Sequence, residues 1–124
     1  MNIKCGIDII EIDRIKENID SLGERFLNRI YTNKEIGYCE SKKNQKYQHY
    51  AARFAAKEAV FKAISEQFDN KYEISWTDIE ILNEKDGKPK VNFYNIKIEK
   101  LENIDISISH CREYAVASVV ALYN

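Results

Sequence analysis

The chain has 124 residues, of which 44% are hydrophobic and 31% charged, and its formal net charge is −1. These values are typical of one globular domain, here residues 1–124; they exclude a disordered chain and give no indication of a nucleic-acid-binding protein. The three cysteines show no paired spacing, no window approaches the ~20 apolar residues of a membrane span, and no basic start precedes a long apolar run, so we expect a cytoplasmic protein without disulfides, membrane segment or signal peptide.

A first strand is predicted over residues 3–10, because its residues alternate in character. One face of this strand carries Ile3, Cys5, Ile7 and Ile9. The other face carries Asp8, beside Gly6. An acidic residue near the end of a buried-looking strand is unusual. From this segment alone, the simplest interpretation is an aspartate that faces water at the edge of the strand.

Two capping-box patterns follow, in which a hydroxyl and a carboxylate satisfy free amide hydrogens at a helix start. They are Ser21-Leu-Gly-Glu24 and Thr32-Asn-Lys-Glu35. They predict a short helix over residues 21–31 and another over about 33–43.

Three arginines accompany these short helices. Arg25 and Arg29 would lie on one exposed face of the first helix, and Arg14 precedes it. A solvated surface is the simplest interpretation of such arginines.

The longest helix is predicted from Tyr47 to about Phe68, with Asp69-Asn70 as its stop. It contains the stretch RFAAKEAVFKA, residues 53–63, which is rich in strong helix formers. On a helix, Glu58 and Lys62 share one face, while Arg53 and Lys57 form the adjoining stripe. Because alanines let another backbone approach closely, we expect a buried or interface helix that carries an acid and several bases into a confined place.

The second half of the chain predicts two antiparallel hairpins. In the first, residues 73–82 and 91–94 flank an Asp-Gly turn. In the second, residues 104–109 alternate strictly, residues 114–122 form a continuous β-rich run, and His110 lies at the turn between them. The predicted fold class is α+β, with antiparallel hairpins packed on a long central helix and shorter helices.

Few side chains are candidates for chemistry. The sequence contains no glycine-rich phosphate loop of the Walker or Rossmann type, and no Ser-His-Asp arrangement can be read from spacing. His49 lies in a tyrosine-rich helix start, where a surface or packing role is the simplest interpretation. His110 is better placed for function, because turns expose side chains that rigid neighbours position.

The remaining candidates are the carboxylates Asp8 and Glu58, with Lys57 and Lys62 flanking the second. Two carboxylates suit Mg²⁺, which takes one or two protein carboxylates together with substrate phosphates. Neighbouring lysines would neutralise the remaining phosphate charge. The alternative is an ion pair between Glu58 and Lys62 within the helix, worth about 0.3–0.5 kcal/mol. Residue chemistry alone leaves both interpretations open.

Three separated motifs occur in a fixed order along nearly the whole chain. They are Gly6-Ile-Asp8 followed by Glu11 and Arg14, RFAAKEA at 53–59 followed by Lys62-Ala63, and Ser107-Ile-Ser-His110 before Tyr114. This ordered set resembles the motifs of the holo-acyl-carrier-protein synthase family.

The resemblance implies a 4'-phosphopantetheinyl transferase. Such an enzyme moves the phosphopantetheine arm of coenzyme A onto a serine of apo-acyl carrier protein and releases adenosine 3',5'-bisphosphate. The resemblance also implies a homotrimer whose active sites are shared between neighbouring subunits. Neither nucleic acid nor a membrane is an expected partner.

The same resemblance suggests which residues carry the reaction. Asp8 and Glu58 would be the Mg²⁺ ligands, with the metal bridging the pyrophosphate of coenzyme A, while Lys57 and Lys62 would neutralise phosphate oxygens. Asp8, Glu58 and Lys62 would thus form the catalytic set. The base that accepts the serine proton stays open between Glu58, a metal-bound water and Glu35.

Other matched positions concern the nucleotide and the carrier protein. Arg53 and His110 match positions near the nucleotide and its 3'-phosphate. Arg14, Arg25 and Arg29 match basic positions at which the acidic carrier protein docks, which would make these arginines a steering surface.

One segment departs from the family pattern. After the central helix the family carries a Gly-x-Gly loop, whereas residues 65–70 of this chain read SEQFDN. Two alternative functions are a same-fold transferase that acts on carrier domains of larger synthases, and a non-catalytic small trimeric binding module in which Asp8 and Glu58 are structural.

Overall fold

The computed structural model describes residues 1–69 and 73–124. In chain order its elements are β1 (Asn2–Glu11), α1 (Ile12–Leu22), α2 (Glu24–Ile30), α3 (Asn33–Glu40), the 3-10 helix η1 (Lys43–Gln45), α4 (Lys46–Ile64), the 3-10 helices η2 (Ser65–Gln67) and η4 (Trp76–Asp78), β2 (Ile79–Asn83), β3 (Pro89–Phe93), β4 (Leu101–His110) and β5 (Tyr114–Tyr123). No helix among these described residues has the length and apolar character needed to cross a membrane.

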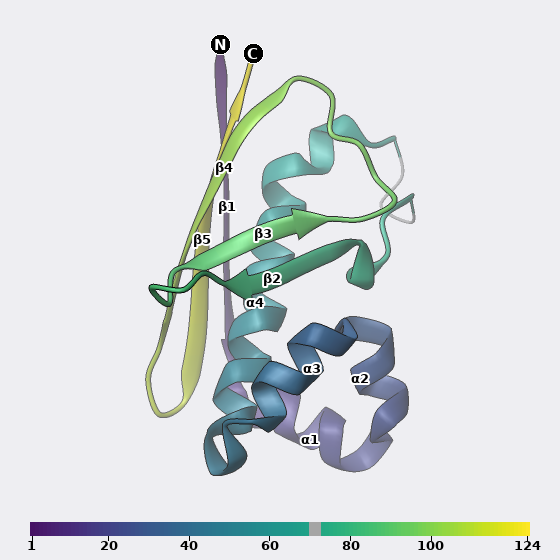
Figure 1. Ribbon diagram of the computed structural model, residues 1–124, viewed down its shortest axis with the longest axis vertical. Helices are drawn as coiled ribbons and strands as arrows, with labels where there is room; N and C mark the ends of the chain where they lie inside the picture. Colours follow the sequence, from purple (N-terminus) through teal and green to yellow (C-terminus); the bar gives the residue numbers. More distant parts are fainter. Residues whose placement is uncertain (70–72) are drawn as a thin grey trace.

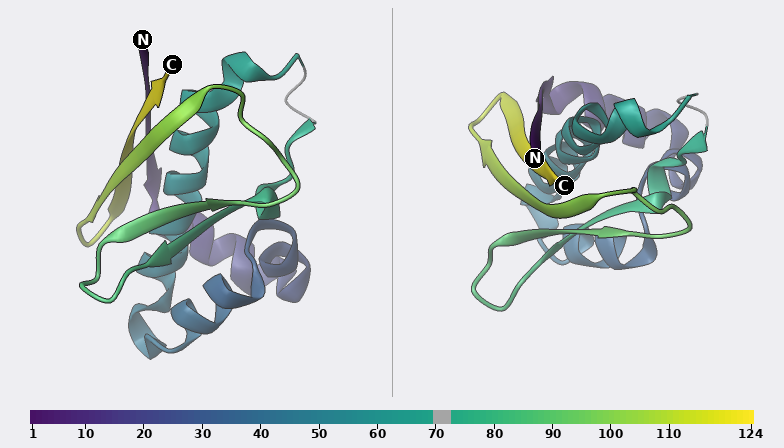
Figure 2. Two further views of the ribbon diagram at one scale, coloured as in Figure 1. Left: turned by 45° about the horizontal axis from the view of Figure 1, so that its top comes forward. Right: turned by 90° about the horizontal axis from the view of Figure 1, so that it is seen from above.

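The strands form two antiparallel sheets, which confirms the predicted α+β class. In the first sheet β5 lies between β1 and β4, and in the second β2 pairs with β3. Helix α4 packs along one face of the first sheet, and the β2–β3 hairpin lies beside β4 and against α4 (Figure 2). Helices α1, α2 and α3 gather at one end of α4 (Figure 1).

Helix α4 is buried because its small side chains let the sheet approach it closely. Eleven of its residues are buried, and Ala55, Ala59 and Ala63 belong to the main core cluster. From β5, Ala117 and Val119 enter the same cluster. The prediction of a buried, alanine-rich central helix is therefore confirmed.

The short helix predicted over residues 21–31 forms as α2, but it begins at Glu24, and the capping box expected at Ser21 does not form. Ser21 belongs instead to the last turn of α1, where its hydroxyl donates to the Glu17 carbonyl. Gly23 has a φ of 59° and separates α1 from α2. By contrast, the capping box at Thr32 and Glu35 is formed, and α3 begins directly after Thr32.

The two faces of β1 differ in their exposure. Ile3, Ile7 and Ile9 are between 63% and 64% exposed, on the face of the sheet opposite α4. Gly6, the buried residue of the strand, lies on the face that contacts α4. The helix thus covers the face that carries Gly6 and Asp8, where the absence of a side chain at Gly6 allows close packing.

The two predicted hairpins form, with different bounds. A 3-10 turn replaces the first part of the strand expected over residues 73–82, so that β2 begins at Ile79. In the second hairpin, His110 is the last residue of β4 and pairs with Ala115. The predicted helix stop at Asp69-Asn70 includes Asn70, which lies outside the described residues, and α4 itself ends at Ile64.

Candidate active site

Strand β1 lies directly against α4 because Gly6 has no side chain. A Cβ atom at Gly6 would stand 1.8 Å from the carbonyl oxygen of Ala59, which no real contact allows. Side chains two residues apart in a strand share a face, so Asp8 is directed toward the same helix as Gly6. The glycine therefore sets how closely Asp8 approaches α4.

Asp8, Glu58 and Lys62 form one group, called here the carboxylate cluster. The Lys62 ammonium lies 3.4 Å from Asp8 Oδ1 and donates to the Ile7 carbonyl at 2.8 Å. Burial, and then the negative charge of Asp8, raise the pKa of Glu58, while Lys62 opposes the rise. The Asp8 side chain is only 18% exposed, so it is not the solvent-facing aspartate that the strand alone suggested.

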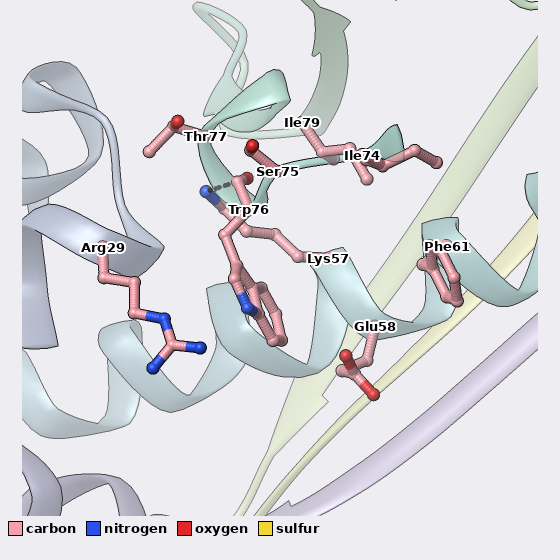
Figure 3. Close-up of a pocket in the computed structure, with 9 residues that line it drawn as sticks. All are labelled: Arg29, Lys57, Glu58, Phe61, Ile74, Ser75, Trp76, Thr77 and Ile79. Atoms are coloured by element: carbon pink, nitrogen blue, oxygen red, sulfur yellow. Dashed lines mark hydrogen bonds between the residues drawn. The ribbon is translucent and has the colours of Figure 1, made fainter. Parts of the chain in front are cut away.

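A cavity of about 510 Å³ opens beside Glu58. Figure 3 shows Arg29 from α2 and Glu58 from α4 on either side of the Trp76 indole. Apolar walls come from Phe61 and Ile79. A carboxylate and a guanidinium thus face one open cavity, in which they can contact a charged ligand.

Lys57 also borders this cavity, but its ammonium is held inside the protein. It lies 2.6 Å from Glu35 Oε1 and donates to the carbonyl of Ile30 at 2.6 Å. It also donates to the carbonyl of Trp76 at 3.2 Å (Figure 3). Both side chains of the ion pair are fully buried. Burial lowers the pKa of Lys57, and the neighbouring Glu35 carboxylate opposes that change. The ammonium therefore already has three partners in the protein.

Both carboxylate oxygens of Glu35 also have hydrogen-bond partners within the protein. Its Oε1 accepts a hydrogen bond from the Thr32 amide and its Oε2 one from the Ile81 amide, both at 2.8 Å. A buried carboxylate with these partners and with Lys57 has no route to a substrate hydroxyl. The structure thus argues against Glu35 as the base, one of the alternatives that the sequence left open.

Arg53 and His110 lie apart from the carboxylate cluster. Arg53 precedes Glu58 by five residues, which places the two side chains about 140° apart around α4. His110 ends β4, and β5 separates β4 from β1, which carries Asp8. One chain therefore does not bring Arg53 and His110 together with the carboxylate cluster.

The three arginines expected at a docking surface are all exposed. Arg14 lies on α1, and Arg25 and Arg29 lie on α2. Only Arg29 among them lines the cavity beside Glu58. The arginines thus extend from the mouth of the cavity over the neighbouring helices.

Sequence reasoning missed two groups of residues. The Glu35–Lys57 ion pair joins residues from two helices, and no local spacing indicates it. Tyr38 and His49 lie near Arg53 and His110: the rings of Tyr38 and His49 are 5.5 Å apart, and those of His49 and His110 are 6.0 Å apart. One signal was present, because His49 precedes Arg53 by four residues and therefore shares its helix face.

Comparison with known proteins places the chain among relatives of one kind. The family model of the 4'-phosphopantetheinyl transferase superfamily matches residues 4–119. A holo-[acyl-carrier-protein] synthase of Ruminiclostridium cellulolyticum is 46% identical over 125 residues, an alignment that covers 97% of this chain and 92% of the relative.

Solved structures of proteins of this kind have a fold similar to that of the present chain. A holo-(acyl-carrier-protein) synthase from Bacillus anthracis, crystallised in complex with CoA (3',5'-ADP), superposes with a TM-score of 0.80 at 36% identity, covering 98% of this chain and 96% of the other. The holo-[acyl-carrier-protein] synthase of Helicobacter pylori, in complex with coenzyme A, gives a TM-score of 0.82 at 32% identity, covering 95% and 99%.

Proposed function

The chain belongs to the holo-[acyl-carrier-protein] synthase family of the 4'-phosphopantetheinyl transferase superfamily, and on this premise we propose that it transfers 4'-phosphopantetheine from coenzyme A to a serine of apo-acyl carrier protein. The serine oxygen forms a bond to the β-phosphorus, the bond from that phosphorus to the bridging oxygen breaks, and adenosine 3',5'-bisphosphate leaves. The observation that carries the proposal is the carboxylate cluster, in which β1 delivers Asp8 to Glu58 and Lys62.

We assign Asp8 and Glu58 as the ligands of Mg²⁺. The two carboxylates are close enough for the charge of Asp8 to raise the pKa of Glu58, and a divalent cation would relieve that repulsion. Among the described residues no three His, Cys, Asp or Glu side chains gather into a metal-binding group. Two carboxylates suit a cation that completes its shell with waters and phosphate oxygens. When bound, Mg²⁺ supplies positive charge to the pyrophosphate.

Lys62 and Lys57 take different roles in this proposal. The Lys62 side chain is 51% exposed, so its ammonium can turn from Asp8 toward a phosphate oxygen and stabilise the charge that develops there. The Lys57 ammonium is occupied by Glu35 and two carbonyls. For Lys57 we therefore replace the expected phosphate contact by a structural one: it fixes Trp76 and the end of α2 as walls of the cavity.

Glu58 lines the cavity, but as a ligand of Mg²⁺ it would be a weakened base, so the serine proton passes either to Glu58 or to a water molecule. Arg14, Arg25 and Arg29 would steer the acidic carrier protein toward this mouth. Arg53 and His110 would bind the nucleotide end of coenzyme A.

We further propose a homotrimer with shared active sites. Its support is twofold: the uncovered sheet face carries Ile3, Ile7 and Ile9, and one chain keeps the carboxylate cluster apart from Arg53 and His110. Because β1 is an edge strand of its sheet, a neighbouring copy that covered the isoleucines would also reach past this edge to the face that carries Asp8 and supply the missing half of the site.

The transferase is tested by intact-mass measurement of apo-acyl carrier protein incubated with the protein, coenzyme A and Mg²⁺. We expect a mass gain of one phosphopantetheine arm with release of an equal amount of adenosine 3',5'-bisphosphate, and neither with Glu58→Gln. Bound coenzyme A without any mass gain would overturn the proposal. An excised carrier domain of a larger synthase, assayed in parallel, measures target choice.

The shared site is tested by co-expression. Light scattering should give the mass of three chains. Co-expressed Glu58→Gln and His110→Ala chains should regain activity at limiting coenzyme A that neither variant has alone, because some mixed interfaces contain both native residues. A monomer, or no regained activity in proven mixed trimers, contradicts a shared site.

A further inference from the structure

The guanidinium of Arg53 is buried without a counter-charge. Arg53 is only 3% exposed, and among the described residues it forms no ion pair with a carboxylate. Its Nε is buried and has no hydrogen-bond partner in that part of the chain. A buried charge left uncompensated is costly, so its retention points to an anion that completes the site.

Two contacts hold this guanidinium in place. Its central carbon lies 4.1 Å from the centre of the Tyr38 ring, and its Nη2 donates to Asn83 Oδ1 at 2.6 Å. The amide of Asn83 in turn donates to the Gly87 carbonyl at 2.8 Å, which ties the guanidinium to the turn of the β2–β3 hairpin. The planar cation is therefore oriented before any ligand arrives.

The Tyr38 ring also contacts a second cation. The ammonium of Lys42 lies 4.8 Å from the centre of the same ring. The negative faces of the ring attract both cations and offset part of the repulsion between them. Two cations at one aromatic ring, without an acid paired to either in the described chain, form a concentrated positive site.

His49 extends this arrangement to His110. The His49 ring meets the Tyr38 ring edge-on, at 82°, and meets the His110 ring at 65°. His110 is exposed at the end of β4, whereas His49 is half-buried and one turn before Arg53 on α4. Burial, and then the positive charges of Arg53, Lys42 and His110, lower the pKa of His49. A neutral His49 can therefore support His110 without adding repulsion.

We propose that Tyr38 and His49 are positioning residues of a phosphate-monoester site: Tyr38 holds Arg53 and Lys42 at one ring, and His49 sets the ring of His110. The identity of the ligand, the 3'-phosphate of coenzyme A, rests on the proposed function. A phosphate monoester matches the site because it carries close to two negative charges and three acceptor oxygens. Tyr38 and His49 would thus set the preference for coenzyme A over 3'-dephospho-coenzyme A.

The test is calorimetric binding of both coenzymes to the wild-type protein, Tyr38→Phe, Tyr38→Leu, Lys42→Met and His49→Leu. Wild type and Tyr38→Phe should share one affinity ratio, because the aromatic face is kept. Tyr38→Leu should lower the ratio about tenfold. Lys42→Met and His49→Leu should each lower the affinity ratio about threefold. The Lys42 side chain is exposed and therefore tolerates this change.

Tyr47→Leu is the matched control. Tyr47 also lies near two lysines, Lys16 and Lys46, but its hydroxyl already donates to Asp20, so the affinity ratio should stay unchanged. The proposal is overturned if wild type does not distinguish the two coenzymes, or if folded Tyr38→Leu or folded His49→Leu keeps the wild-type ratio. The carrier-modification assay separates the two proposals: transfer without discrimination removes only this inference, whereas discrimination without transfer removes only the proposed function.

Discussion

Gly6→Ala tests the contact on which the carboxylate cluster depends. The new methyl carbon would start 1.8 Å from the Ala59 carbonyl oxygen and needs at least 3.0 Å, so β1 must move away from α4 by about 1.2 Å. Both neighbours are backbone or buried alanine, and no flexible side chain can yield instead. A shift of this size withdraws Asp8 from Glu58 and stretches its 3.4 Å contact with Lys62.

The expected losses follow from that displacement. Overpacking of this kind costs about 1–3 kcal/mol of the free energy of unfolding. A misplacement of about 1 Å at a reacting centre lowers a catalytic rate about a hundredfold. The free energy of unfolding is measured by urea denaturation, and the catalytic rate by the initial rate of holo-carrier formation. The variant is assayed at a temperature well below the midpoint of its thermal denaturation.

Gly37→Ala provides the control, since the new methyl carbon would meet no atom within 4 Å and the residue lies inside helix α3. It should gain about 0.5–1 kcal/mol of stability and keep the wild-type rate. If folded Gly6→Ala retained the wild-type rate, close packing of β1 on α4 would not be what positions Asp8.

Three further predictions concern charge. Lys57→Met leaves the buried Glu35 carboxylate unpaired and should lower the free energy of unfolding by about 3–5 kcal/mol. The double variant Glu35→Gln/Lys57→Met should lose less of this free energy, because no lone charge stays buried. Urea denaturation measures both losses, and a double variant less stable than Lys57→Met contradicts the prediction. Because the pKa of His49 is lowered on folding, the unfolded chain binds its proton first as the pH falls below about 6.5, so stability decreases there. His49→Gln should reduce the slope of stability against pH below that value, and identical slopes would remove His49 from the acid response. Arg14→Glu/Arg25→Glu should raise the KM for carrier protein about tenfold without changing coenzyme A affinity, and an unchanged KM would exclude both from docking.

Local signals predicted the fold where one segment decides its own structure. The capping box at Thr32 depends only on residues within four positions, and it forms. The same pattern at Ser21 failed because Gly23 takes a positive φ just inside it, and because Ile12, Ile15 and Ile19 bury one face of an earlier helix. Helical spacing of these isoleucines was the competing signal.

The site depended on packing between distant segments, which spacing cannot supply. Motifs identified Asp8 and Glu58, but their proximity requires the close contact of Gly6 with Ala59. The alternation of β1 could not say which face meets the helix, since both faces were compatible with burial. Likewise, the sequence gives no partner for Lys57, and only the fold shows that its ammonium forms an ion pair with Glu35.

The Glu35–Lys57 ion pair also constrains which substitutions the protein can accept during evolution. Its contacts reach Ile30, Thr32, Trp76 and Ile81, so several elements meet at one ion pair. Either residue replaced alone leaves a lone buried charge, whereas an apolar or amide pair of similar volume can be nearly neutral. A scan of single substitutions would score both positions as intolerant even though the pair as a unit is replaceable. The two positions are thus epistatic, and lineages that exchange the pair must pass through a poorly folded intermediate or change both residues together.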